Sequence, residues 1–472
     1  MKVLFISLPH KIEFGEKINQ VFKSPPITHL WLAANLEKEG HSVTILDALA
    51  LGMTFDQIIN EIEKEAPQII GFTVFTSGYH DVMFAARRIK EKFLDIKIAV
   101  GGYHVNSLPS EFQHDYIDYI FVGEAEYDFV DLVNGLDAGN LKKENIKNMV
   151  FYDSNICEWV TNEVREFRVD MDNQPLLPYE KILGNGYTTW WTTINPSHQK
   201  YMATISGRGC ALDCSFCDIS KTEGLRYRCM SPERVIEEIE YMSSLGITHI
   251  EFRDPFFTAD MERVIKIAEG LIKKNLKVEW GCSSTIQKMR DSKTLKLMYD
   301  SGCRFLFFGV ESGNPEILKR EKKVTPEKVA NVVRMTKDAG IAAHCSFIFG
   351  LEGEDESTMK ETLNLALKLK PSTASFSFAC PYPGTAMYDS YAEKGYLTRE
   401  DWRKYDGHEP VFQTEQISKE LLKKYIKKAH LGFYYRPAFL LDRLAGINSY
   451  RELASLASIG MKMLFDVTSY KR

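Results

Sequence analysis

Short apolar runs alternate with amphipathic stretches through residues 1–135, and this alternation predicts strands separated by helices. The runs predicted as strands are Lys2–Leu8, Ser42–Asp47, Gln68–Phe75, Ile96–Gly101 and Tyr119–Val122. One intervening helix is expected over Ile27–Glu39, with Gly40 as its stop. Because helices separate consecutive strands, we predict right-handed crossovers and a doubly wound parallel sheet. A ligand of such a sheet binds at the carboxyl ends of the strands.

A second alternation of the same kind predicts a partial (βα)6 barrel over residues 196–398. Its expected strands are Tyr201–Ser206, His249–Arg253, Lys277–Cys282, Arg304–Val310, Ala342–Phe349 and Ala374–Ala379. Helices are expected over Pro232–Ser244, where Ser231 is the candidate N-cap, and over Thr325–Ala339. The site of such a barrel lies at the C-terminal ends of its strands.

The remaining segments are less regular. Residues 136–195 are predicted to form a linker with a hairpin of Met149–Tyr152 and Glu158–Thr161. Residues 399–472 are predicted to be a C-terminal helical region. Basic and apolar residues alternate in Leu421–Lys428, which favours a packed helix with a solvated basic face over a helix on a membrane surface.

Composition narrows the class of protein. Of the 472 residues 44% are hydrophobic and 26% charged, and the net charge of -5 gives no indication of a nucleic-acid partner. The apolar run in Lys2–Leu8 is too short for a signal peptide, and no stretch is long enough to predict a membrane span. We therefore expect a cytoplasmic protein.

Cysteine usage points to metal chemistry. The chain has 9 cysteines, an odd number, and the first is Cys157. In a large cytoplasmic chain this indicates metal ligands and buried thiols, not a disulfide framework. Buried thiols are the favoured interpretation for those on or near predicted strands, namely Cys229, Cys282, Cys303, Cys345 and Cys380.

Three cysteines form one short loop directly after a predicted strand. Cys210, Cys214 and Cys217 have the spacing C-x3-C-x2-C. Three thiolates on one loop can hold three irons of a cubane cluster and leave the fourth iron open to a small chelating molecule. A structural zinc loop is the alternative, with Cys229 or His198 as a fourth ligand, but the strand context disfavours it.

This loop, with the aromatic Phe216 before the last cysteine, resembles that of the radical S-adenosylmethionine (SAM) superfamily. The resemblance implies that Cys210, Cys214 and Cys217 hold a catalytic [4Fe-4S] cluster. It further implies that the open iron binds the amino and carboxylate groups of SAM. Reduction of the cluster then cleaves SAM to a 5′-deoxyadenosyl radical.

Later segments resemble the same superfamily. They are Phe308–Gly313 ("ESG"), Ser346–Glu354, which includes Gly350, and Pro381–Thr385 ("PYPGT"). By resemblance, Glu311, Ser312, Ser346 and Gly350 are candidates for contact with SAM; a helix cap at Glu311 and simple packing of Ser346 are the alternatives. Many relatives carry Gly-Gly-Glu after the second strand, whereas this chain has Arg253-Asp254-Pro255, so Asp254 is the candidate there.

The first domain resembles the cobalamin-binding domain of B12-dependent radical SAM proteins. The segments that carry the resemblance are 24–26 (Ser-Pro-Pro), 101–104 (Gly-Gly-Tyr-His) and 123–126 (Gly-Glu-Ala-Glu). The residues implied to bind cobalamin are Gly101, Gly102, His104, Gly123 and Glu124. A tight glycine turn and a satisfied turn histidine are the alternatives.

Two features of related proteins are absent from this sequence, and each changes what the resemblance implies. The Asp-x-His-x-x-Gly segment that supplies a lower cobalt ligand in many cobalamin proteins is replaced by residues 10–15, so cobalamin is expected without a histidine ligand. The absence of cysteine before Cys157 excludes the second cluster of methylthiotransferases.

The chain is therefore identified as a member of the cobalamin-dependent radical SAM family, which includes methyltransferases and the anaerobic magnesium-protoporphyrin monomethyl ester cyclase. The resemblance implies an α/β fold, with a flavodoxin-like cobalamin domain before the barrel. It implies methylation of an unactivated carbon through the deoxyadenosyl radical and methylcobalamin. Oxidative cyclisation or rearrangement is the alternative, and a non-catalytic cobalamin sensor a remote one. The implied partners are a small-molecule substrate and an electron donor such as flavodoxin or ferredoxin.

Overall fold

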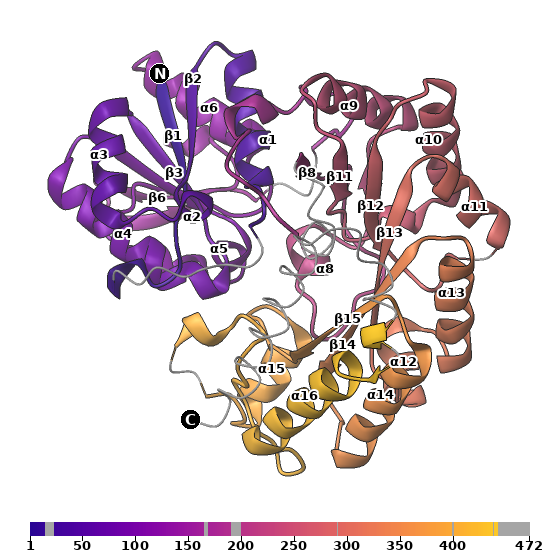
Figure 1. Cartoon of the computed structure of the whole chain (residues 1–472). Coiled ribbons are helices and arrows are strands. Elements are labelled where there is room, and N and C mark those ends of the chain that lie inside the picture. The colour runs from indigo at the N-terminus through magenta and orange to yellow at the C-terminus, as the bar shows by residue number, and fades with distance from the viewer. Residues whose placement is uncertain are drawn as a thin grey trace. The chain divides into compact units, whose positions relative to one another are not determined.

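A computed structural model describes residues 1–14, 23–164, 169–189, 200–289, 291–398, 401–437 and 439–441 (Figure 1). The chain forms two compact units. The first comprises Met1–Tyr187, Asp218–Cys229 and Asp401–Arg403. The second comprises Thr188–Cys217, Met230–Glu400 and Lys404–Arg472. Each unit is built on its own sheet, as the two alternations predicted.

The first unit contains a 7-stranded sheet in the order β2-β1-β3-β4-β5-β6-β7. Its parallel strands are β1 (Lys2–Ser7), β2 (Ser42–Asp47), β3 (Ile69–Thr73), β4 (Lys97–Gly101) and β5 (Tyr119–Phe121). The order 2-1-3-4-5 is that of flavodoxin-like folds, whose ligands bind where the strand order reverses. The predicted fold class of this part is confirmed.

Helices cover both faces of this sheet. Alternate residues of β1 point to opposite faces: Leu4 and Ile6 join a core with Ile58 of α3 (Phe55–Glu65) and Val82 of α4 (Tyr79–Lys92). Phe5 instead packs on His29 of α1 (Ile27–Lys38) and Phe129 of α6 (Glu126–Asp137), with ring centroids 5.2 and 5.6 Å away. The sheet is therefore doubly wound.

The predicted hairpin has a different place from the one we expected. Its strands, β6 (Met149–Asp153) and β7 (Glu158–Thr161), pair antiparallel, and β6 also pairs antiparallel with β5. The hairpin extends the first sheet because the backbone groups at the edge of β5 need partners. It is part of the first unit, not a free-standing linker.

The second unit contains a 6-stranded parallel sheet in which strands that follow one another along the chain are neighbours. The strands are β8 (Tyr201–Thr204), β11 (His249–Phe252), β12 (Glu279–Ser284), β13 (Cys303–Glu311), β14 (Ala342–Phe349) and β15 (Thr373–Phe378). Intervening helices include α9 (Pro232–Ser244), α10 (Met261–Lys273), α11 (Ser292–Asp300), α12 (Pro315–Lys322), α13 (Pro326–Asp338) and α14 (Glu356–Leu369). Ser231 caps α9 by accepting the Arg234 N–H at 3.3 Å, as predicted. The arrangement confirms the partial barrel.

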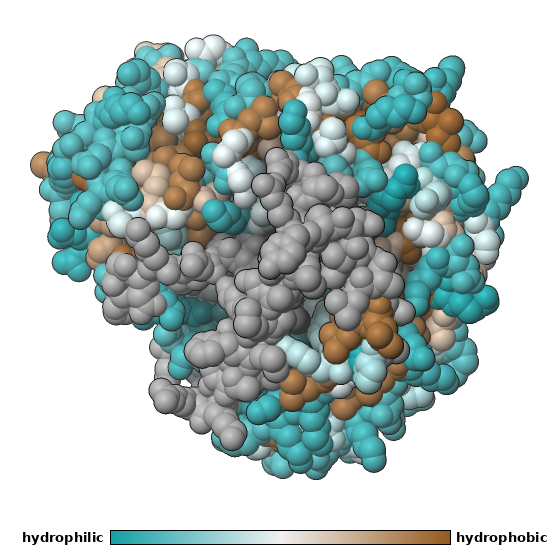
Figure 2. Space-filling view, in the orientation of Figure 1, coloured by the Kyte–Doolittle hydropathy of each residue, from teal (hydrophilic) through white to brown (hydrophobic). Residues whose placement is uncertain are grey.

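A long helix, α16 (Lys419–Tyr434), packs against the last strands of this sheet. Tyr425 lies 6.0 Å from Phe349, and Phe433 lies 6.0 Å from Phe376, measured between ring centroids. The apolar face of α16 is therefore buried, as we predicted for a packed helix. Among the residues that the structure describes, none of the helices has the length and hydropathy to cross a bilayer. The surface visible in Figure 2 is mostly hydrophilic, with scattered apolar residues.

Candidate active site

The three-cysteine loop leaves the sheet at the C-terminal end of β8. Cys214 is buried, Cys210 and Cys217 are half-buried, and none of the three forms a disulfide. The Cys217 N–H donates to the Cys214 carbonyl at 3.1 Å, which closes the turn between them. Among the described residues, no three His, Cys, Asp or Glu side chains are placed so that they could hold a single metal ion. The donor set itself, three thiols on one loop, fits a [4Fe-4S] cluster with one open iron.

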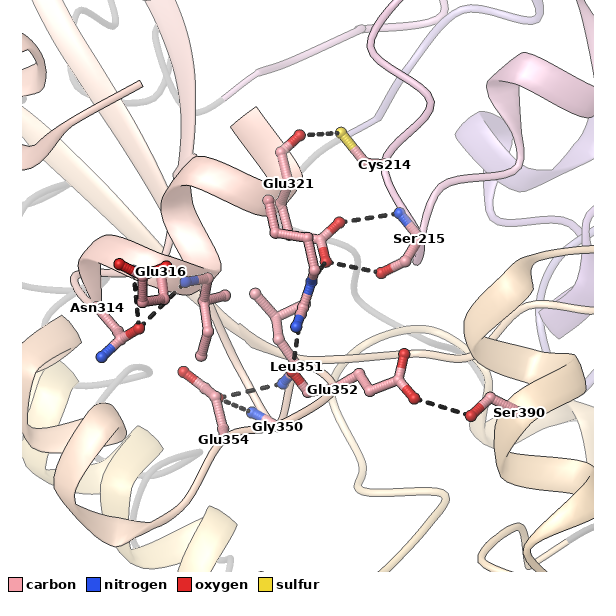
Figure 3. Close-up of polar contacts among 12 residues, drawn as sticks. Cys214, Ser215, Asn314, Glu316, Glu321, Gly350, Leu351, Glu352, Glu354 and Ser390 are labelled. Carbon is pink, nitrogen blue, oxygen red and sulfur yellow. Dashed lines mark hydrogen bonds and ion pairs between the residues drawn. The ribbon is translucent and has the colours of Figure 1, made fainter. Parts of the chain in front are cut away.

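Helix α12 holds this loop through Glu321, a residue that the sequence analysis did not select (Figure 3). The Ser215 N–H and the Ser215 hydroxyl each donate to the Glu321 carboxylate at 2.9 Å. The Cys214 thiol donates to the Glu321 carbonyl at 3.1 Å. Glu321 follows Ile317 and Leu318 on the buried face of the helix. A charged residue at such an apolar-face position is the sequence signal that would have identified it.

Three further side chains, one each from β13, β14 and α12, meet next to the loop. The Lys322 ammonium and the Glu311 carboxylate are 3.0 Å apart, and the Ser346 hydroxyl donates to Glu311 at 3.0 Å. Lys322 also lies over the ring of Phe216, 5.5 Å from its centroid. The structure thus brings together Glu311, Ser346 and Phe216, which the sequence predicted as site residues, and adds Lys322.

Burial and neighbouring charges together set the pKa values of Lys322 and Cys214. Burial alone lowers the pKa of Lys322, but the Glu311 carboxylate and the Cys214 thiol outweigh it and raise that pKa above its ordinary value. Burial also raises the pKa of the Cys214 thiol, and Lys322 opposes that effect. Lys322 is therefore a charged ammonium held beside the cysteine loop.

Asp254 supports the loop from the neighbouring strand. It is fully buried after β11, and its carboxylate accepts the Ser206 N–H at 2.6 Å and the Ser206 hydroxyl at 2.9 Å. Arg263 donates to the same hydroxyl at 2.8 Å and to the Met230 carbonyl at 2.7 Å. Asp254 thus ties the end of β11 to the start of the cysteine loop. Its predicted contact with SAM stays a prediction.

Ser312 and Gly350 are integrated into turns. Ser312 is buried, lies 3.3 Å from the Thr362 hydroxyl, and accepts the Asn314 N–H at 3.2 Å. Gly350 has a φ of +95°, and a Cβ there would lie 2.7 Å from the Phe412 ring. Gly350 is therefore required for close packing. Contacts of either residue with SAM stay predictions.

The turn after β14 also contains Glu354, whose carboxylate accepts the N–H groups of Gly350 at 2.6 Å and Leu351 at 3.1 Å (Figure 3). Its other oxygen is buried without a hydrogen-bond partner among the described residues. Burial raises the pKa of Glu354 to about 8, while the two N–H groups oppose the shift. The folded chain therefore holds a proton here that an unfolded chain releases near the ordinary value of 4.5.

The raised pKa of Glu354 predicts that the free energy of unfolding depends on pH. Because the folded-state pKa is raised, the folded chain binds more protons than the unfolded chain between about pH 4.5 and pH 8, and stability falls as pH rises through that window. Glu354→Gln keeps the neutral form and is expected to be more stable than the wild type by about 2–4 kcal/mol at pH 8, with little difference near pH 4.5. Chemical unfolding across this range measures the difference. An equal pH dependence in both proteins contradicts the prediction.

In the first unit, the predicted glycines lie at the carboxyl ends of β4 and β5. Gly102 has a φ of +109°, and a Cβ there would lie 2.8 Å from the Val74 nitrogen, so only glycine allows the close approach. A Cβ on Gly101 would make ordinary contact with Phe121. Gly123 has a φ of +93° and faces open space. At the same edge Phe75 is 55% exposed and stacks on Tyr103, 5.6 Å between centroids.

His104 and Glu124 instead make internal contacts. His104 is fully buried, with its ring nitrogens 3.2 Å from the Thr76 hydroxyl and 3.3 Å from the Glu111 carboxylate. These contacts agree with the alternative of a satisfied turn histidine. The Glu124 carboxylate accepts both terminal nitrogens of Arg228, at 2.6 and 3.0 Å. Both residues thus bind other residues of the first unit near the edge of the sheet. Their contact with cobalamin stays a prediction.

Comparison with known protein families gives two matches in the same order as the two units. Residues 18–133 match the B12 binding domain, and residues 204–366 match the radical SAM superfamily. The chain is similar to an uncharacterised methyltransferase of Pyrococcus horikoshii, with 31% identity over 93% of this chain and 94% of that protein. It is also similar to the anaerobic magnesium-protoporphyrin IX monomethyl ester cyclase of Rubrivivax gelatinosus, with 26% identity over 93% of this chain and 78% of that protein.

Among solved structures, the cobalamin-dependent SAM radical enzyme OxsB, with aqua-cobalamin and SAM bound, has a similar fold. Its TM-score is 0.76, with 19% identity, and the match covers 99% of this chain and 72% of OxsB. At this identity the likeness concerns the fold. It supports the assignment of one unit to each of the two family matches.

Proposed function

Because this chain belongs to the cobalamin-dependent radical SAM family, with a [4Fe-4S] cluster, SAM and cobalamin as cofactors, we propose that it methylates an unactivated carbon of a small molecule. The observation that carries this proposal is the likeness to a methyltransferase along almost the whole chain, 31% identity over 93% of its length. When bound, the cluster and SAM supply a carbon-centred radical and cobalamin supplies the methyl group.

The chain's own residues have positioning roles in this proposal. Cys210, Cys214 and Cys217 hold the cluster, and the buried Lys322–Glu311 pair beside the loop orients the polar end of SAM. These groups are fixed before SAM binds, since the pair is held by Ser346 and the loop by Glu321. Preorganised charges of this kind lose little energy to reorganisation during the reaction.

The face proposed for cobalamin is the carboxyl edge of the first sheet. The stacked rings of Phe75 and Tyr103 and the open side of Gly123 lie there. A large flat macrocycle needs an apolar platform and close backbone approach, and aromatic and glycine residues supply them. Phe75 was not selected from the sequence because an aromatic residue at the end of a strand usually packs in the core.

Oxidative cyclisation is the second candidate, favoured by the 26% identity to the magnesium-protoporphyrin cyclase over 93% of this chain. Both candidates use the radical, but only a methyltransferase must reload its cobalamin with a methyl group. The distinction can therefore be tested without knowing the substrate.

The test is to incubate the protein, reconstituted anaerobically with iron, sulfide and reduced cobalamin, with methyl-labelled SAM. We expect label on the bound cobalamin and one equivalent of S-adenosylhomocysteine, with 5′-deoxyadenosine formed in parallel when dithionite is present. Protein reconstituted without cobalamin is the control. If 5′-deoxyadenosine forms while the bound cobalamin stays unlabelled, methyl transfer is excluded and cyclisation or rearrangement is favoured.

A further inference from the structure

We propose that Glu321 is a positioning residue that keeps the reduction potential of the cluster low by withholding the Ser215 N–H from the cluster sulfurs. The proposal rests on the cluster that the family supplies, and it does not depend on methyl transfer. Its test therefore gives a result whether or not the methyltransferase proposal is correct.

The first step is the orientation of the Ser215 amide. Ser215 directly follows Cys214, so its N–H is the first backbone donor after this proposed cluster ligand. In this structure that N–H donates to the Glu321 carboxylate at 2.9 Å, and the Ser215 hydroxyl donates to the other oxygen at 2.9 Å. Both donors of Ser215 are thereby turned toward α12 (Figure 3).

The second step is the fixed position of the Glu321 carboxylate. The side chain is buried. The Nε of Arg320 donates to this carboxylate at 2.7 Å. Arg320 also donates to the Glu352 carbonyl at 2.7 Å, which fixes α12 to the turn after β14. The carboxylate therefore stays in place as the acceptor of the Ser215 N–H.

The third step is the effect on the cluster. Hydrogen bonds to the sulfurs are among the factors that set the potential of an iron–sulfur cluster, and a donor near sulfur favours the reduced, more negative form. A carboxylate that takes up the Ser215 N–H removes one such donor. The loss of this donor lowers the potential and makes the reduced cluster a stronger donor of the electron that cleaves SAM.

The experiment is a redox titration of the reconstituted full-length protein, followed by electron paramagnetic resonance of the reduced cluster. The variants are Glu321→Ala and Glu321→Gln. Glu316→Ala is the matched control, since Glu316 is an exposed residue of the same helix. We expect a tenfold more favourable reduction in Glu321→Ala, which is a rise of about 59 mV for a one-electron couple. Glu321→Gln should rise less, because an amide oxygen still accepts one bond, and the control should match the wild type.

An unchanged potential in a Glu321→Ala variant that retains its cluster overturns the proposal. If both variants lose iron, the proposal also fails, because Glu321 is then needed to hold the cluster or the fold and not to set the potential.

Discussion

Replacing Cys210, Cys214 and Cys217 together with alanine is expected to lower the iron content from about four atoms per chain to background and to abolish SAM cleavage. The expectation follows from the loop after the C-terminal end of β8, which carries these three cysteine thiols. Without thiolates no iron is held, and no electron reaches SAM. Iron and sulfide analysis after anaerobic reconstitution, with 5′-deoxyadenosine quantified by chromatography, measures both effects.

Two single variants serve as controls for this experiment. Cys157→Ala removes an exposed thiol from the first unit and should leave iron and activity unchanged. Cys229→Ala tests the zinc alternative, in which Cys229 supplies a fourth ligand. Iron that persists in the triple variant, or one zinc per chain that is lost with Cys229, contradicts the three-cysteine cluster.

The strands of both sheets were predictable because their apolar runs are short, bounded by turn residues and separated by helical periods. Ser42–Asp47 and Ala342–Phe349 begin and end where the sequence predicted. The hairpin of β6 and β7 was also predicted, but its place was not. Whether a hairpin stands alone or joins a sheet depends on the edge available to it, and that edge is a property of the folded unit.

The site was only partly predictable, because spacing identifies chemistry and not side-chain partners. The three cysteines are close together in the sequence, so their motif can be recognised without knowledge of the fold. Glu321 and Lys322 lie within a run of charged residues that looks like a solvated helix end. The spacing of Glu321 from Ile317 and Leu318 is a signal that could have identified it, whereas only the fold shows that Lys322 turns inward. Conversely, His104 and Asp254 resemble ligands in the sequence, yet the structure gives each of them buried internal partners.

Replacing Lys322 with methionine is expected to destabilise the barrel unit by about 3–5 kcal/mol, because it leaves the Glu311 carboxylate buried without its cation. The side chains of Lys322 and Glu311 are 14% and 8% exposed, so water cannot replace the lost partner. Glu311 also has a left-handed backbone, with a φ of +69°, which is costly for a residue other than glycine. The increase in amide hydrogen exchange of β13 and β14 measures the loss locally.

The double variant Lys322→Met/Glu311→Gln separates the charge effect from packing. Replacing both partners removes the unpaired charge, so most of the lost protection of β13 and β14 should return. SAM binding should not return, because the proposed anchor for its polar end is still missing; equilibrium binding to the reconstituted protein measures this. A double variant that stays as unstable as Lys322→Met would mean that the lysine stem fills space beside Phe216 and that its charge contributes little. A double variant that recovers both stability and SAM affinity would assign the pair to folding alone and leave the polar end of SAM to other groups on the loop.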